Sequence, residues 1–117
     1  MAKLDWMYHR KNCQTCQKTD GYLEREGISV DTIVDCKKEP MTFPEAKSLL
    51  KGVKRLYATR GTKVVEVDMA SKPADPELIS LMIGPSGKLR APTIKNGDVL
   101  VIGFNEDMYG RALAGKK

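Results

Sequence analysis

The chain has 117 residues, a length that suits one domain with one hydrophobic core. Hydrophobic residues make up 41% of it and charged residues 30%, both within the range of soluble globular proteins. The formal net charge of +5 is compatible with an acidic partner. Lys and Arg are scattered along the chain, so we expect a solvated surface and no direct binding of nucleic acid.

Targeting and membrane segments are not evident in the sequence. Residues 1–12 lack the long apolar stretch of a signal peptide. No apolar run approaches the roughly 18 to 20 residues that a helix needs to cross a bilayer. Repeats and Gly/Ser linkers are also missing. We therefore expect residues 1–117 to form a single cytoplasmic domain, without membrane contact and monomeric.

The N-terminal third of the chain predicts a strand, a helix and a second strand. Residues 4–9 mix aromatic and apolar side chains in a short run typical of a strand. Residues 13–26 predict a helix that ends at Gly27, and residues 29–36 alternate as a strand does. One face of the helix carries Cys16, Thr19 and Leu23. A strand–helix–strand unit of this length implies two parallel strands.

The middle of the chain shows two capped helices. A capping box at Thr42 begins one helix, which is expected to end at Gly52. Asp75, followed by a proline, caps a second helix that is expected to end at Gly84. The pattern of residues 53–74 is less clear, and we expect this segment to be partly helical.

The C-terminal part predicts a hairpin and a last helix. Residues 92–103 contain Asn96-Gly97, the pair that most favours a tight turn between antiparallel strands. Asn105 can cap the final helix. The full order is strand–helix–strand, a helical insert at about 37–88, then strand–strand–helix. It predicts an α/β protein with a thioredoxin-like fold and a four-stranded mixed sheet.

Cys13 and Cys16 stand where the first strand gives way to a helix. A nucleophilic thiol must be ionised, and a free Cys has a pKa of about 8.5. At a helix start, unpaired N–H groups and the helix dipole favour the thiolate, and Arg10 and Lys11 add positive charge. Cys16 lies one turn further along, within reach of a mixed disulfide. We predict that Cys13 attacks and Cys16 resolves.

Other interpretations of the cysteines remain. Both could be buried sulfur without chemistry, because a free Cys often acts as a small apolar residue. His9, Cys13, Cys16 and Cys36 could bind zinc, although a closed site usually takes two ligands from each of two loops. An iron–sulfur cluster shared between two chains is a further alternative. We expect no metal, and we expect Cys36 to pack at the core or a sheet edge.

With these residues located, the chain resembles the arsenate-reductase-like branch of the thioredoxin superfamily, which also contains the Spx regulators of RNA polymerase. The resemblance is carried by YHRKNCQTCQKTDGYLEREGI (8–28) and VDCKKEPMTFPEAKSLL (34–50). The ending APTIKNGDVLVIGFNEDM (91–108) is more similar to a glutaredoxin. The resemblance implies that the Ala91–Pro92 bond is cis and that these two residues shape a substrate groove facing the cysteines.

Arsenate reductases of this branch hold an oxyanion with three arginines. Arg60 could match the first, but the second normally stands immediately before the cis-proline, where this chain has Ala91. Arg90 lies one residue earlier, and a shift of one residue in an extended segment turns a side chain to the opposite face. The third position, near Gly103, has no arginine. Arsenate reduction is therefore disfavoured.

The resemblance implies a thiol–disulfide oxidoreductase acting on protein or low-molecular-weight disulfides, with no bound cofactor. Glutathione is a candidate reductant: Arg10 and Lys11 would hold its glycine carboxylate, and Asn105 and Glu106 its γ-glutamyl end. The alternative is a redox-switched regulator that binds RNA polymerase, since the Spx regulators also carry CxxC.

Overall fold

The structure, a computed structural model, describes residues 3–10, 14–60, 63–85 and 87–113. Its strands are β1 (Lys3–His9), β2 (Ser29–Asp35), β3 (Arg55–Arg60), β4 (Lys63–Asp68), β5 (Thr93–Asn96) and β6 (Val99–Ile102). Its helices are α1 (Gln14–Arg25), α2 (Phe43–Ser48), α3 (Asp75–Met82) and α4 (Glu106–Leu113), with a 3-10 turn at Met69–Ser71. Among the described residues, no helix is long and apolar enough to span a bilayer.

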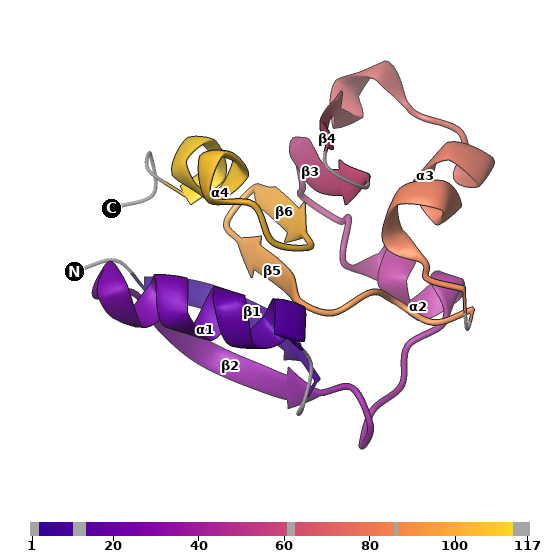
Figure 1. Ribbon diagram of the computed structural model, residues 1–117. Coiled ribbons are helices and arrows are strands. Elements are labelled where there is room, and N and C mark those ends of the chain that lie inside the picture. The colour runs from indigo at the N-terminus through magenta and orange to yellow at the C-terminus, as the bar shows by residue number, and fades with distance from the viewer. Residues whose placement is uncertain (1–2, 11–13, 61–62, 86, 114–117) are drawn as a thin grey trace.

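A six-stranded mixed sheet in the order β2-β1-β5-β6-β3-β4 runs through the molecule, and helices cover both of its faces (Figure 1). Helices α1 and α4 pack on one face and α2 and α3 on the other. The strand–helix–strand unit is confirmed, because β1 and β2 pair in parallel around α1. The buried face of α1 is the predicted one, formed by Cys16, Thr19 and Leu23.

The predicted number of strands was wrong. The insert at 37–88 contains β3 and β4, which pair antiparallel within the segment that we expected to be partly helical. Strand β3 also pairs in parallel with β6, so the insert widens the sheet from four strands to six. Leu56 and Ala58 of β3 face the α2/α3 core while Tyr57 faces the α1/α4 core, so this short apolar run is a strand buried on both faces.

Both middle helices differ in detail from the prediction. Thr42 precedes α2 as expected, but α2 ends at Ser48, before Gly52. The residue that precedes α3 is Ala74, so Asp75 is the first helical residue and not the cap. Its carboxylate therefore lies in the first turn, where the helix dipole favours a negative charge.

The strand directions place the start of α1 at one end of the sheet. Strands β1 and β2 end there, and so do β6 and β3, which are parallel to each other. Strand β5 begins there, because it is antiparallel to both β1 and β6. Helix α1 begins shortly after β1 ends, so the start of α1 and the start of β5 lie at the same end of the sheet.

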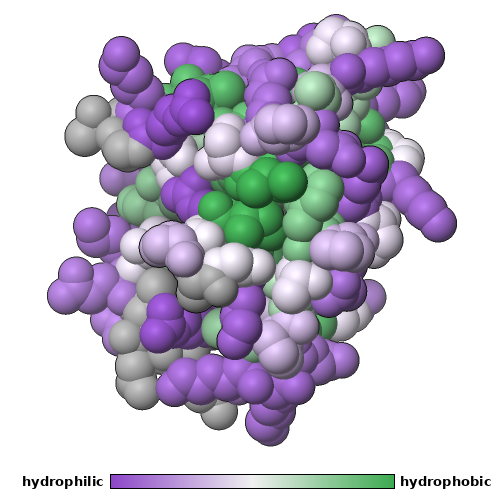
Figure 2. Space-filling view, turned by 90° about the vertical axis from the view of Figure 1, so that its right-hand side faces the viewer, coloured by the Kyte–Doolittle hydropathy of each residue, from purple (hydrophilic) through white to green (hydrophobic). Residues whose placement is uncertain are grey.

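Figure 2 looks onto the side of the molecule where α2 and α3 lie. Hydrophobic surface gathers in the middle of this side, and hydrophilic residues surround it. This side therefore has an apolar centre within a hydrophilic surround.

Gly103 follows β6 at a point of close approach. Its φ is 91°, and a Cβ at this position would lie 2.1 Å from Thr59 Oγ1. Its N–H donates to the carbonyl of Pro92 over 2.8 Å. Only glycine combines this backbone conformation with this proximity.

We predict that Gly103→Ala lowers the free energy of unfolding by about 2–4 kcal/mol, through the left-handed backbone and the overpacking against Thr59. Denaturant titration measures it. Gly110→Ala in α4 is the matched control, because a Cβ there meets nothing within 4 Å. A loss of equal size in both variants would contradict the account.

Candidate active site

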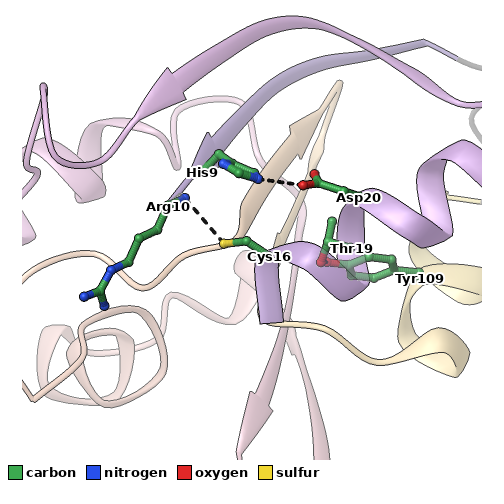
Figure 3. A network of polar contacts seen from close by, with 6 residues as sticks. All are labelled: His9, Arg10, Cys16, Thr19, Asp20 and Tyr109. Carbon is green, nitrogen blue, oxygen red and sulfur yellow. Dashed lines mark hydrogen bonds and ion pairs between the residues drawn. The ribbon is translucent and has the colours of Figure 1, made fainter. Parts of the chain in front are cut away.

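Cys16 is the described member of the cysteine pair; Cys13 and Lys11 lie outside the described residues. Cys16 is buried in the first turn of α1. The backbone N–H of Arg10, directly after β1, donates to its Sγ over 3.4 Å (Figure 3). The contact gives the buried sulfur a hydrogen-bond partner on the backbone. This sulfur is therefore fixed at the junction of strand and helix that the sequence predicted.

A buried hydrogen-bond chain supports the helix behind Cys16. The hydroxyl of Tyr109 donates to the carbonyl of Gly103 over 2.6 Å and lies 2.8 Å from Thr19 Oγ1 (Figure 3). Because the carbonyl can only accept, the Thr19 hydroxyl donates to Tyr109. Burial raises the pKa of Tyr109 well above its usual range, so the phenol keeps its proton. The hydrogen bond between Thr19 and Tyr109 joins α1 to α4 one turn after Cys16.

We predict that Tyr109→Phe costs about 1–3 kcal/mol of folding free energy, because the Thr19 hydroxyl and the Gly103 carbonyl lose their buried partner. Denaturant titration of the reduced protein measures this loss. Tyr22→Phe, which removes the hydroxyl of the half-buried neighbouring ring 5.2 Å away, is the control. A Tyr109→Phe variant as stable as the parent would refute the role of the chain.

His9 helps to hold α1 on the sheet. Its Nε2 lies 2.9 Å from Asp20 Oδ2, which joins the end of β1 to α1 (Figure 3). Within residues 3–10, 14–60, 63–85 and 87–113, no three His, Cys, Asp or Glu side chains group to hold a metal ion. Cys13, a member of the alternative zinc set, is outside those ranges.

A cleft of about 710 Å³ opens at the end of the sheet where α1 begins. Its wall combines the start of α1, the segment after β2 and the segment before β5. Representative lining residues are Arg10, Thr15, Cys36, Lys88, Ala91 and Gly103. The cleft therefore brings together parts of the chain that are up to 95 positions apart, from Tyr8 to Gly103.

The predicted cis bond is confirmed: the peptide between Ala91 and Pro92 is cis. Pro92 is buried and Ala91 lines the cleft. Thr15, in the first turn of α1, lines the same cleft. The structure thus brings the cis-proline segment and the helix start to one cavity.

The charged side chains among the described lining residues of the cleft are all cationic. They are Arg10, Lys37, Lys88 and Arg90. Their common sign raises the local concentration of anionic molecules at the cleft. Anionic ligands are therefore favoured at the cleft over neutral or cationic ones.

Arg90 lines the cleft, but its guanidinium is bonded to the protein. Nη1 donates to the carbonyls of Thr59 and Leu81 over 2.8 and 3.1 Å, and Nη2 donates to Thr59 Oγ1 over 2.9 Å. Burial lowers the pKa of Arg90. These contacts join β3 to the end of α3, so they make Arg90 a structural clamp at the cleft wall.

Two further predicted binding residues make structural contacts. Arg60 is exposed, and its Nη2 donates to Ser80 Oγ over 3.4 Å. It does not belong to the described residues that line the cleft. Asn105 caps α4 as predicted, because its Oδ1 accepts the N–H of Met108 over 2.9 Å.

We predict that Arg90→Lys lowers the free energy of unfolding by about 2 kcal/mol or more, because an ammonium group cannot reproduce the forked contacts with Thr59 and Leu81. Arg60→Lys is the control, and we expect less than about 0.5 kcal/mol there. Thermal and denaturant unfolding measure both. Equal stability of the two variants would contradict the clamp.

Sequence reasoning missed how the segment after β2 becomes a wall of the cleft. Tyr8 accepts the N–H of Met41 over 3.0 Å and donates to the carbonyl of Glu39 over 2.9 Å. Cys36 lines the cleft and also packs against the α2/α3 core, as its expected edge position suggested. The buried tyrosine in β1 is the signal for this anchoring, but its partners are more than 30 positions away.

A mixed sheet covered on both faces, with a helix start and a cis-proline at one cleft, defines a thioredoxin-like protein. The family model described as the ArsC family matches residues 8–112, and the chain belongs to this family. The glutaredoxin-like ending seen in the sequence, residues 91–108, falls wholly within the matched region.

The curated relatives agree with this assignment. The chain is 29% identical to the global transcriptional regulator Spx of Staphylococcus aureus (strain Mu50), with 94% of the chain and 87% of Spx covered. It is 25% identical to the uncharacterized protein YusI of Bacillus subtilis, covering 87% of the chain and 92% of YusI.

A solved structure shows the same fold. The solution NMR structure of SACOL0876 from Staphylococcus aureus COL aligns with a TM-score of 0.54 and 25% identity. The alignment covers 97% of this chain and 98% of that one. Together, the matches set the chain among thioredoxin-like redox proteins and Spx-like regulators.

Proposed function

We propose that the protein is a small cytoplasmic thiol–disulfide oxidoreductase, in which Cys13 attacks and Cys16 resolves. One observation carries the proposal: the first turn of α1, with Cys16 buried in it, and the cis Ala91–Pro92 segment meet at one cleft. A cleft of this kind can hold an extended disulfide substrate against the start of the helix.

The reaction needs two exchanges. The Cys13 thiolate attacks a substrate disulfide, forms a mixed disulfide and releases one substrate thiolate. Cys16 then attacks the Cys13 sulfur, forms the 13–16 disulfide and releases the second thiolate. The two electrons pass from the cysteine pair to the substrate, and a thiol reductant such as glutathione restores the pair.

The position of Cys16 suits the second exchange. Its burial keeps bulky substrates away from the sulfur, while Cys13 precedes it by only three residues in the sequence. The Arg10 N–H stabilises negative charge on Sγ at 3.4 Å. Attack within one chain also gains from the high effective concentration of a neighbouring group.

Substrate attraction is assigned to the exposed cations of the cleft, Arg10, Lys37 and Lys88. The carboxylates of glutathione, or acidic residues around a protein disulfide, would complement them. Arg90 shapes the wall, and Asn105 fixes the start of α4. Ala91 and Pro92 supply backbone groups to the cleft. Lys11 adds a positive charge close to the cysteine pair in the sequence.

We predict that Cys16→Ser, treated with glutathione disulfide, accumulates a mixed disulfide between Cys13 and glutathione, because only the first exchange remains possible. Cys13→Ser should form no such adduct, because it lacks the attacking thiolate. Mass spectrometry of the intact protein measures the adduct. The Cys13 pKa from pH-dependent alkylation is expected below the ordinary value of about 8.5. Cys36→Ser is the control and should keep the turnover of the parent.

Two results would contradict this mechanism. One is a Cys13 pKa at or above that of an unperturbed thiol. The other is a Cys16→Ser variant that turns over as fast as the parent and traps no adduct.

A redox-switched regulator that binds RNA polymerase is the second candidate, favoured by the 29% identity to Spx over 94% of the chain. A regulator responds to its own oxidation and does not turn over. Co-purification with RNA polymerase that depends on the state of the 13–16 pair, without turnover of glutathione disulfide, would support this candidate over the first.

A further inference from the structure

A groove of about 510 Å³ lies between α2, the segment after β4 and the start of α3. Its apolar lining residues are Pro44, Leu50, Met69, Pro73 and Leu78. Leu78 belongs to the buried α2/α3 core, while Leu50 and Met69 are only partly buried. The groove therefore opens the edge of this core to solvent.

Cations line the same groove. Lys47, Lys51 and Lys72 contribute to its wall, and Asp75 is the one acidic residue among its described lining residues. The Nζ of Lys47 lies 2.9 Å from Asp75 Oδ1, so these two charges compensate each other. Lys51 and Lys72 then give the groove a net positive rim.

A neighbouring hollow of about 490 Å³ shares Met69 with the groove. Its charged lining residues are Lys54, Arg55 and Asp68, and Arg55 is paired with Glu66. The positive charge of the groove therefore comes from Lys51 and Lys72 and is not extended by this hollow.

Lys72 has an unusual backbone conformation. Its φ of 52° makes it the non-glycine residue with positive φ in the described part of the chain. Only a few per cent of non-glycine residues adopt such values. The 3-10 turn fixes it there, because its N–H donates to the Met69 carbonyl over 3.2 Å.

The groove is separate from the redox cleft. Among the described residues, the linings of the two have no member in common. A ligand of the groove therefore need not contact the residues that line the cleft.

We propose that this groove docks an acidic amphipathic segment of a partner protein. Apolar side chains at helical spacing would enter between Leu50 and Leu78, and flanking carboxylates would approach Lys51 and Lys72. Charge complementarity selects this occupant. A second copy of the chain would bring its own net charge of +5, and a nucleic-acid backbone would leave the apolar floor unfilled.

The test uses a fluorescein-labelled 14-residue peptide with Leu at helical spacing and Glu elsewhere, titrated with the full chain and followed by anisotropy. A matched peptide with Gln in place of Glu is the comparison. We expect saturable binding of the acidic peptide that weakens with salt, and binding of the Gln peptide at least about tenfold weaker.

The variant Lys51→Glu with Lys72→Glu is expected to weaken binding of the acidic peptide by about tenfold or more. Lys18→Glu with Lys63→Glu changes the net charge equally at exposed sites outside the groove lining and should bind as the parent does. Lys51→Gln with Lys72→Gln should fall between, and thermal unfolding checks that each variant is folded. Turnover of glutathione disulfide should stay unchanged in all of them.

Three outcomes would overturn the proposal. They are a dissociation constant above about 1 mM for the acidic peptide, equal binding of the Gln peptide, and equal loss in the Lys18/Lys63 control. Stronger binding of single-stranded DNA than of the peptide at the same groove, or dimerisation lost in the Lys51/Lys72 variant, would assign the groove to another occupant.

Discussion

The close approach of Gly103 to Thr59 is the contact on which the cleft edge depends. The Gly103 N–H bonds to the carbonyl of Pro92, and its carbonyl accepts the hydroxyl of Tyr109. Thr59 in turn accepts two hydrogen bonds from Arg90. Gly103 thus joins the cis-proline segment to α4 through its two backbone hydrogen bonds. The bonds between Arg90 and Thr59 join the same segment to β3. A larger residue in place of Gly103 would push against Thr59 and disturb both sets of hydrogen bonds.

This arrangement also decides what the cleft can do chemically. The guanidinium of Arg90, two residues before the cis-proline, donates its hydrogen bonds to carbonyl and hydroxyl groups of the protein itself. Arg60 lies outside the described lining of the cleft, and the position near Gly103 has no arginine. The remaining exposed cations attract an anion without enclosing it. That pattern favours exchange at sulfur in an anionic molecule over capture of a small oxyanion.

Local signals predicted the parts of the fold that local chemistry determines. The helix start at the cysteines, the cap at Asn105 and the hairpin after Pro92 each depend on neighbouring residues, and each was found from the sequence. Strands β3 and β4 were missed although Gly61-Thr62 separates two β-prone runs, because β3 shows no alternation when both of its faces are buried. The role of Arg90 depends on Thr59, 31 positions away, which no local pattern reports.

The cleft and the groove have separate linings, but the same segments build both. The Leu89 N–H donates to the Met41 carbonyl over 2.8 Å, and Met41 leads directly into α2. Ile83, which ends α3, pairs with Leu89 in an isolated bridge. The walls of the cleft are therefore continuous with the two helices that line the groove. Because the connections are backbone hydrogen bonds, substitutions of the lysines on the groove rim leave them in place, and the two sites can be studied independently by mutation.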